Sequence, residues 1–373
     1  MNKPKYTTLV LFVAIALLSQ GVLGQNRRPS IVSPEVHPDK TVTFRLYMPD
    51  ARKVVVSTQF ESEDQAMTKD TSGVWSVTLG PVQPDIYPYS FVVDGVRIMD
   101  PNNPLYFPNE HFKNSLVDIP GDTPLVHSLQ DVPHGIVSYR YYHSKTLNTI
   151  RPLVIYTPPG YEKNRSEKYP VLYLIHGMTD TEETWFKVGH ANLILDNLIA
   201  QGKAEPMIIV MPYANTYSYG GRVVDREEIL QTDLFNQDML LDIIPFVERN
   251  YRTLTDKAHR AIAGFSLGGR QTLAVGLGNP ELFDWVCAYS PAIWPNEFEN
   301  DFENVYASPE KINQLKLFSL SCGTEDGLYK SSQAFDAALK EKNIEPQTFF
   351  PPGGHSWMNC KLYLTKSAQV LFR

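Results

Sequence analysis

The stretch "HRAIAGFSLGGR", residues 259–270, places one serine between glycines, after a short apolar run and before a helix-like run. "RAIAG" is short and apolar enough to be a buried strand, and "LGGRQTLAVGLGNP" predicts a helix. A strand-to-helix turn lifts its central side chain out of the sheet, and it forms only if Gly264 and Gly268 leave room for both backbones. The stretch therefore predicts a nucleophile elbow at Ser266 within an α/β domain, rather than an ordinary turn serine.

A serine hydroxyl is a weak nucleophile at neutral pH and needs a base, together with a group that orients the base. The strand-like run in "KLFSLSCGTEDGLY" ends in a loop with Glu325 and Asp326, and "TFFPPGGHSWMNC" presents His355 after a Gly-Gly turn. Asp326 is favoured over Glu325, because a shorter carboxylate just before a glycine suits a fixed bond to the imidazole. We predict a triad of Ser266, Asp326 and His355.

Acyl transfer also needs backbone N–H groups at the position where the oxyanion forms. Leu267, directly after the serine, would supply one. "LIHGMTD" ends an early buried strand, and Gly177 permits a sharp turn that points the N–H of Met178 inward. His176 is interpreted as a structural histidine bonded to backbone, rather than as a second base.

The patterning of the chain changes once along its length. Residues 25–120 are assigned to a small β-sandwich, because period-two runs such as "TVTFRLY" recur and Asp94-Gly95 is a strong hairpin signal. "DIPGDTPLVHSLQDVPHG" holds three prolines without a period, and it marks a linker over 121–134. From 135 to 373 apolar strand-like runs alternate with helical stretches, which predicts a doubly wound α/β domain. One such stretch, Thr232 to Tyr251, contains Pro245, which should kink the helix or lie near its start.

Residues 1–24 have the layout of a cleavable secretory signal: two lysines, an apolar run and small residues up to Gly24. The apolar run is shorter than the ~20 residues that a spanning helix needs, which disfavours a membrane anchor. We expect a periplasmic or secreted product that has no membrane association after cleavage. The net charge of −7 and the absence of a Lys/Arg run argue against a nucleic-acid partner.

Cysteine and histidine spacing limits the remaining chemistry. Cys287, Cys322 and Cys360 allow at most one disulfide, whose partners the sequence does not identify. The histidines are scattered, without the spacing of a metal site. We expect no metal and no cofactor.

These segments together resemble the esterase-D-like group of α/β-hydrolases, particularly the feruloyl and acetylxylan esterases of the first carbohydrate esterase family. The resemblance rests on "YLIHGMTDTEETWF", "ANLILDNLIAQGKAEPMIIVMP", "DLFNQDMLLDIIPFVERNYRTLTDKAHRAIAGFSLGGRQTLAVGL", "CGTEDGLY" and "GGHSW", and it spans most of 135–373. The region 31–120 resembles the early-set, carbohydrate-module-like domain that often precedes such esterases. The resemblance implies the same triad, with Met178 and Leu267 as oxyanion donors. One departure is Cys360, at a place where family members often carry a second aromatic.

Feruloyl esters require an aromatic acid to be held beside the serine, so a stacking surface is expected. "YANTYSYGGRVVD" is an aromatic, glycine-containing loop after a predicted strand, and it belongs at the edge of the sheet where α/β sites lie. Core packing is the alternative for each aromatic taken singly. The candidate substrate-binding residues are Trp185, Tyr213, Tyr217, Tyr219, Phe265, Trp294 and Trp357. In the sandwich, Trp75, Tyr87 and Tyr89 are candidates for a sugar platform, with core packing favoured for at least half of them.

The sequence hypothesis is a secreted serine esterase that releases hydroxycinnamate, chiefly ferulate, from plant cell-wall arabinoxylan through an acyl-enzyme. Its expected partners are feruloylated or acetylated xylan oligosaccharides. Three alternatives stay open: xylan deacetylation by the same machinery, with dual activity as a variant; a siderophore triesterase, which would favour a basic pocket; and a non-catalytic carbohydrate-binding protein on a decayed hydrolase fold. The oligomeric state, and whether the N-terminal domain binds glycan, are not determined by the sequence.

Overall fold

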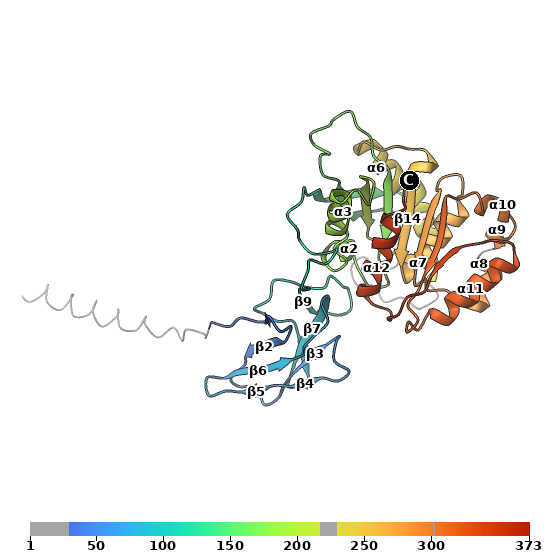
Figure 1. The fold of residues 1–373 in the computed structure, drawn as a ribbon. Coiled ribbons are helices and arrows are strands. Elements are labelled where there is room, and N and C mark those ends of the chain that lie inside the picture. The colour runs from blue at the N-terminus through green and yellow to red at the C-terminus, as the bar shows by residue number, and fades with distance from the viewer. Residues whose placement is uncertain (1–29, 217–229, 302) are drawn as a thin grey trace, which may run out of the picture.

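The computed structural model describes residues 30–216, 230–301 and 303–373, so the predicted signal sequence lies outside the described residues. Figure 1 shows a small all-β domain in blue and a larger domain, green to red, in which helices flank a central sheet. The small domain is a sandwich of two sheets, with strand orders β1-β2-β6-β5 and β4-β3-β7-β8, and β9 pairs with β7. Its strands are β1 (Glu35–Val36), β2 (Val42–Tyr47), β3 (Val54–Thr58), β4 (Gln65–Ala66), β5 (Thr68–Lys69), β6 (Val74–Leu79), β7 (Ile86–Val93), β8 (Val96–Ile98) and β9 (Ser115–Asp118).

Apolar and polar residues alternate along the strands, and the inward-facing apolar side chains fill the core of the sandwich. The predicted hairpin between β7 and β8 is present: Val93 pairs with Val96, and Asp94 and Gly95 both have positive φ, 48° and 92°. This is the backbone that a two-residue turn requires and that Asp-Gly accommodates. The three aromatics considered for a sugar platform lie in this core and are nearly inaccessible: Trp75, Tyr87 and Tyr89.

The larger domain is built on one eight-stranded sheet of order β10-β11-β13-β12-β14-β15-β16-β17. The β10–β11 and β11–β13 pairs are antiparallel, and all later pairs are parallel. The strands are β10 (Ile136–Ser144), β11 (Thr149–Thr157), β12 (Val171–Ile175), β13 (Ile208–Pro212), β14 (Arg260–Phe265), β15 (Trp285–Tyr289), β16 (Leu317–Ser321) and β17 (Gln347–Phe349). The helices are α2 (Thr184–Lys187), α3 (Ala191–Ala200), α5 (Asp233–Asp238), η1 (Met239–Ile243), α6 (Ile244–Asn250), η2 (Lys257–His259), α7 (Leu267–Gly278), η3 (Pro295–Glu297), α8 (Phe298–Asp301), α9 (Glu303–Tyr306), α10 (Pro309–Ile312), α11 (Tyr329–Glu341) and α12 (Trp357–Ala368).

Central strand β12 is buried on both faces, because alternate residues pack into two separate cores. Leu172 and Leu174 pack into the core that contains residues of α3 and α12. Tyr173 and Ile175 pack into the core that contains residues of α6, α7 and α11. A continuous apolar strand is stable only with helices on both sides, so the prediction of an α/β domain behind a β-sandwich is confirmed.

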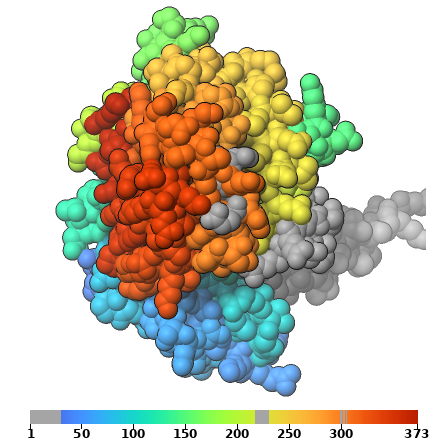
Figure 2. All heavy atoms as spheres, turned by 90° about the vertical axis from the view of Figure 1, so that its right-hand side faces the viewer, coloured from blue at the N-terminus to red at the C-terminus, as the bar shows by residue number. Residues whose placement is uncertain are grey.

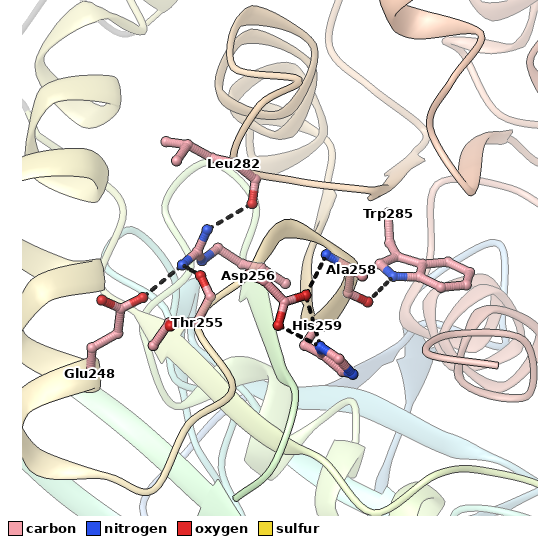
Figure 3. A network of polar contacts seen from close by, with 8 residues as sticks. Glu248, Thr255, Asp256, Ala258, His259, Leu282 and Trp285 are labelled. Carbon is pink, nitrogen blue, oxygen red and sulfur yellow. Dashed lines mark hydrogen bonds and ion pairs between the residues drawn. The ribbon is translucent and has the colours of Figure 1, made fainter.

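The start of β14, the strand that leads to Ser266, is held by a network of polar contacts (Figure 3). Arg260 donates from its guanidinium to the Glu248 carboxylate at 2.7 Å and to the carbonyls of Thr255 and Leu282 at 2.5 and 2.8 Å. Asp256 accepts a hydrogen bond from the N–H of Ala258 in the 3₁₀ turn just before the strand. These contacts hold the N-terminal end of β14, whose C-terminal end leads into the turn at Ser266.

The helix expected between Thr232 and Tyr251 is present in three parts. A π-helical turn, η1, separates α5 from α6, and Pro245 lies in the first turn of α6. A proline lacks the N–H that an inner helical position would need, so a wide turn before it avoids a lost hydrogen bond.

The two domains are in direct contact. The last sandwich strand ends at Asp118 and β10 begins at Ile136, with no helix or strand between them. Met358 of α12 packs against the sandwich core, and the buried Lys361 ammonium lies 2.5 Å from the Asp85 carboxylate. Figure 2 shows the sandwich, blue to cyan, packed directly against the α/β domain, so the two parts form one continuous body.

All three cysteines are buried and carry free thiols, so none of the possible disulfides forms. None of the helices in the described part of the chain is long and apolar enough to cross a membrane.

Candidate active site

Ser266 lies on the turn between β14 and α7, with φ 59° and ψ −116°. This backbone conformation is strained for a residue other than glycine, and it is tolerated only where the surroundings enforce it. A Cβ at Gly264 would come within 2.3 Å of the Gly268 carbonyl oxygen, and a Cβ at Gly268 within 2.3 Å of the His176 carbonyl oxygen. Both glycines are therefore required, and the backbone has the geometry that the nucleophile-elbow prediction needs.

His355 and Asp326 are joined by a hydrogen bond of 2.8 Å between Nδ1 and Oδ2. Burial acts to raise the pKa of Asp326, but the charge and hydrogen bond of His355 and the N–H of Leu328 outweigh it and hold the pKa below its usual value. The acid is therefore ionised at neutral pH and can stabilise an imidazolium. Glu325, the alternative acid, is exposed and makes no such contact with His355.

The imidazole of His355 is also held from a second side. Its ring lies against the ring of Phe265, with centroids 4.4 Å apart and planes inclined by 30°. Ser266 and His355 both line one cleft of about 310 Å³, so the structure brings the predicted nucleophile and base to the same solvent-accessible space.

The other wall of this cleft comes from the N-terminal part of the chain. Its contributors, which the sequence analysis did not select, are Gln59, Pro88, Phe107, Asn109 and Phe112. The available signal was "YFPNEHF", residues 106–112, an aromatic run outside the alternating strands. Among the described lining residues only Asp180 and His355 are ionisable, and none is a lysine or arginine.

The loop after β12 brings the predicted oxyanion donor to the serine. A Cβ at Gly177 would lie 3.5 Å from the Cβ of Ser266, and Met178 follows it in the lining of the cleft. Leu267 is the first residue of α7, where backbone N–H groups have no partner within the helix. Both predicted donors therefore lie next to Ser266, one in space and one in sequence.

His176 has the structural place predicted for it. Its Nδ1 donates to the Gly177 carbonyl at 2.8 Å, and its Nε2 accepts from the Ala214 N–H at 2.9 Å. Burial lowers the pKa of His176 to about 4, so the ring is neutral and both nitrogens are engaged. It is not available as a base.

The aromatic predictions divide into two groups. Phe265 and Trp357 line the cleft. Trp185 does not, which corrects the expectation: it has no exposed surface, and its indole N–H donates to the Ile175 carbonyl at 2.9 Å. It packs edge-on behind Trp357, with centroids 4.8 Å apart.

Tyr213 also needs correction, and Trp294 is not among the described residues that line the cleft. Tyr213 is buried, and its hydroxyl donates to the Glu110 carboxylate. Trp294 is half-buried before η3. Periodicity places an aromatic near the sheet edge but does not say whether it faces the core or the cleft. The remaining two candidates, Tyr217 and Tyr219, lie outside the described residues.

Within 30–216, 230–301 and 303–373, no cluster of three or more His, Cys, Asp or Glu side chains is arranged to hold a metal ion. The arrangement can perform general-base-assisted nucleophilic attack with the groups of the chain itself.

A mainly parallel eight-stranded sheet, a serine on the strand-to-helix turn and a later histidine–aspartate pair define the α/β-hydrolase class. The family model described as putative esterase matches residues 144–362, and the chain belongs to this family of ester hydrolases. A second model, carbohydrate-binding module 48 (isoamylase N-terminal domain), matches residues 30–104. The predicted resemblance to such esterases, with a carbohydrate-module-like domain before the hydrolase, is confirmed.

Two curated relatives are similar in sequence. The chain is 30% identical over 361 residues to an endo-1,4-β-xylanase/feruloyl esterase of Xylanibacter ruminicola, which covers 93% of this chain and 47% of the relative. It is 32% identical over 183 residues to endo-1,4-β-xylanase Y of Acetivibrio thermocellus. This match covers 46% of this chain and 16% of the relative. The chain thus spans about half the length of the first relative and a smaller share of the second.

Solved structures show the same fold. A CE1 ferulic acid esterase of the anaerobic fungus Anaeromyces mucronatus superposes with a TM-score of 0.59 at 27% identity, covering 66% of this chain and 94% of the other. An enterobactin esterase of Shigella flexneri gives a TM-score of 0.65 at 17% identity, and the match covers 89% of this chain and 93% of the other. At that identity the second likeness shows the fold alone.

Proposed function

We propose that this chain is a serine esterase that hydrolyses hydroxycinnamoyl esters, chiefly feruloyl esters, on plant cell-wall xylan. The observation that carries the proposal is the cleft beside Ser266, whose described walls include the aromatic rings of Phe107, Phe112, Phe265 and Trp357. Such rings favour a planar aromatic acid, which can stack against them. The similarity to relatives named feruloyl esterase supports the same substrate class.

The proposed reaction passes through an acyl-enzyme. Ser266 attacks the ester carbonyl while His355 takes the hydroxyl proton, which it then gives to the departing sugar hydroxyl. Asp326 orients the imidazole and stabilises its charged form. The N–H groups of Met178 and Leu267 are assigned to the oxyanion. Water then attacks the acyl-enzyme with the same base, and ferulate leaves.

Charge in the cleft disfavours the siderophore alternative. A ferric catecholate is strongly anionic and would need cations around it. The described lining offers no lysine or arginine, and it adds the carboxyl of Asp180. The acetyl alternative is weaker for a different reason: an acetyl group would leave the aromatic walls of a cleft of about 310 Å³ without a partner. From the leader-like residues 1–24 we further propose that the protein is exported.

The test is hydrolysis of methyl ferulate and a feruloylated arabinoxylan oligosaccharide, beside acetylated xylan, by the wild type, Ser266→Ala and Ser331→Ala. Ser331 lies on α11 and is a matched control, since it is not among the residues that line the cleft. Ferulate release that Ser266→Ala loses and Ser331→Ala keeps is the expected result. Acetate release alone would keep the serine mechanism but refute the feruloyl assignment. If none of the esters is hydrolysed in a way that depends on Ser266, the result would favour a non-catalytic carbohydrate-binding protein.

A further inference from the structure

The loop that carries the predicted oxyanion donor is in contact with the N-terminal part of the chain. Asn109 and Asp180 form an isolated antiparallel β-bridge, and the N–H of Glu110 donates to the Thr179 carbonyl at 2.8 Å. A segment from before the hydrolase domain therefore pairs directly with residues 177–180, which line the cleft beside Ser266.

The side chain of Asn109 is buried and uses its full hydrogen-bonding capacity. Its Nδ2 donates to Oδ1 of Asp180 and to Oγ1 of Thr179, both at 3.0 Å. Its Oδ1 accepts from the backbone N–H of His111 at 2.9 Å and of Phe112 at 3.2 Å. The contacts with the Asp180 carboxylate and with two backbone N–H groups fix the orientation of the amide, because a flipped amide would place like groups against each other at all three. One side chain thus joins the aromatic wall at Phe112 to the oxyanion loop.

Asp180 passes this constraint to the oxyanion donor. Its N–H donates to the Gly177 carbonyl at 3.2 Å, which closes a tight turn with Met178 and Thr179 inside it. Its Oδ2 lies only 3.2 Å from the position that a Cβ at Gly177 would occupy. The carboxyl therefore lies against the peptide that precedes Met178, and holding that carboxyl holds the direction of the Met178 N–H.

We propose that Asn109 is a positioning residue for ester hydrolysis: through Asp180 it holds the 177–180 loop so that the Met178 N–H faces the carbonyl that Ser266 attacks. This inference rests on the proposed serine-esterase function. It means that the N-terminal part of the chain completes the catalytic machinery of the hydrolase domain, in addition to any contact it makes with glycan.

The first test compares Asn109→Ala with Asn197→Ala. Asn197 is a matched control, because it is also a buried asparagine and donates two bonds, to the carbonyls of Val126 and Ser128, between the segment that joins the domains and α3. Displacing an oxyanion donor by about 1 Å weakens only the transition state. We expect Asn109→Ala to lower kcat about 10- to 100-fold with KM within about threefold, and Asn197→Ala to keep kcat within about threefold.

The second test uses Asn109→Asp, which keeps the acceptor for Phe112 but replaces the donor with a second carboxyl group facing Asp180. Burial raises the pKa of Asp180 to about 7, and the Glu110 carboxylate adds to this, while Asn109 and the Gly177 N–H oppose it. The Cys360 thiol of α12 also lies near Asp180. One proton shared between two facing carboxyl groups restores a hydrogen bond. The kcat of Asn109→Asp relative to wild type should therefore rise as the pH falls from 8 to 6.

Both tests use 4-nitrophenyl acetate as well as methyl ferulate, because an oxyanion forms on any ester. The inference is overturned if Asn109→Ala keeps kcat within about threefold of wild type. It is equally overturned if both asparagine variants lose activity in proportion to their loss in Tm, or if the Asn109→Asp ratio is constant with pH. If the wild type hydrolyses 4-nitrophenyl acetate but not methyl ferulate, only the feruloyl proposal is refuted. The comparison of Asn109→Ala with Asn197→Ala on 4-nitrophenyl acetate would then still test the positioning role of Asn109.

Discussion

The contact between β14 and α7 can be tested by adding a single methyl group at Gly264. In Gly264→Ala the new Cβ would lie 2.3 Å from the Gly268 carbonyl oxygen and 2.6 Å from Oγ1 of Thr272, whereas ordinary contacts begin at 3.4 Å. The strand and the helix must therefore separate by about 1 Å, and Ser266 is the residue that joins them. A displacement of that size at a reacting group costs about 100-fold in rate, and overpacking of this kind costs about 1–3 kcal/mol of stability.

Gly278→Ala provides the control, since it is the same substitution at the far end of the same helix. Nothing lies within 4 Å of the Cβ that would be added there. Replacing a helical glycine by alanine reduces the entropy of the unfolded chain, so we expect about 0.5–1 kcal/mol of added stability and unchanged kcat. The assay is kcat on methyl ferulate and 4-nitrophenyl acetate, with Tm measured for each variant.

We expect Gly264→Ala to lose about 100-fold in kcat while at least part of the protein stays folded at assay temperature. Wild-type kcat in Gly264→Ala, or equal losses in both glycine variants, would show that close approach at the turn does not set the position of the serine.

Three further predictions follow from contacts at the site. Asp326→Asn should lower kcat about 10⁴-fold, because a neutral amide favours the wrong tautomer of His355, whereas Glu325→Gln should stay within about twofold; equal effects would overturn the assignment of the acid. Phe112→Ala should raise KM for methyl ferulate about tenfold and leave KM for ethyl acetate unchanged, and parallel changes in both would argue against an aromatic acid pocket. The folded-state pKa of His176, about 4, lies below the ordinary 6.5, so the unfolded chain takes up the proton first as the pH falls. The contribution of neutral His176 to the free energy of unfolding is therefore complete above pH 6.5 and is lost as the pH falls toward 4. The expected loss in the free energy of unfolding between pH 7 and pH 5 is about 2 kcal/mol. Urea unfolding of wild type and His176→Gln at both pH values measures it, and equal pH slopes would contradict it.

The order of elements was predictable because it depends on local patterns. Apolar runs bounded by turn residues predicted strands such as β12 and β14, and the glycines at 264 and 268 predicted the turn that presents Ser266. The preference for Asp326 came from its place before Gly327, and the structure buries Asp326 against His355 while Glu325 is exposed. Neighbouring residues in a turn point in different directions, so one carboxylate can reach the imidazole only if the other does not.

The direction of aromatic side chains was not predictable in the same way. Trp185 follows β12 and Trp357 follows β17, and both pack into the same core, yet only Trp357 also lines the cleft. The difference depends on the packing of α12 over the sheet, which brings Trp357 in front of Trp185. No period within either segment carries that information.

The sequence by itself determined the sandwich, the α/β domain and the serine, acid and histidine candidates, because hydrophobic period, turn glycines and chain order are properties of short segments. Only the tertiary structure decided that a segment before the hydrolase domain forms one wall of the cleft. Asn109 meets Asp180 across 71 positions of the chain, and Phe107 meets Trp357 from the other end of the fold. Such contacts arise when two independently patterned domains pack together, and the residues that make them carry no shared spacing that a linear pattern could reveal.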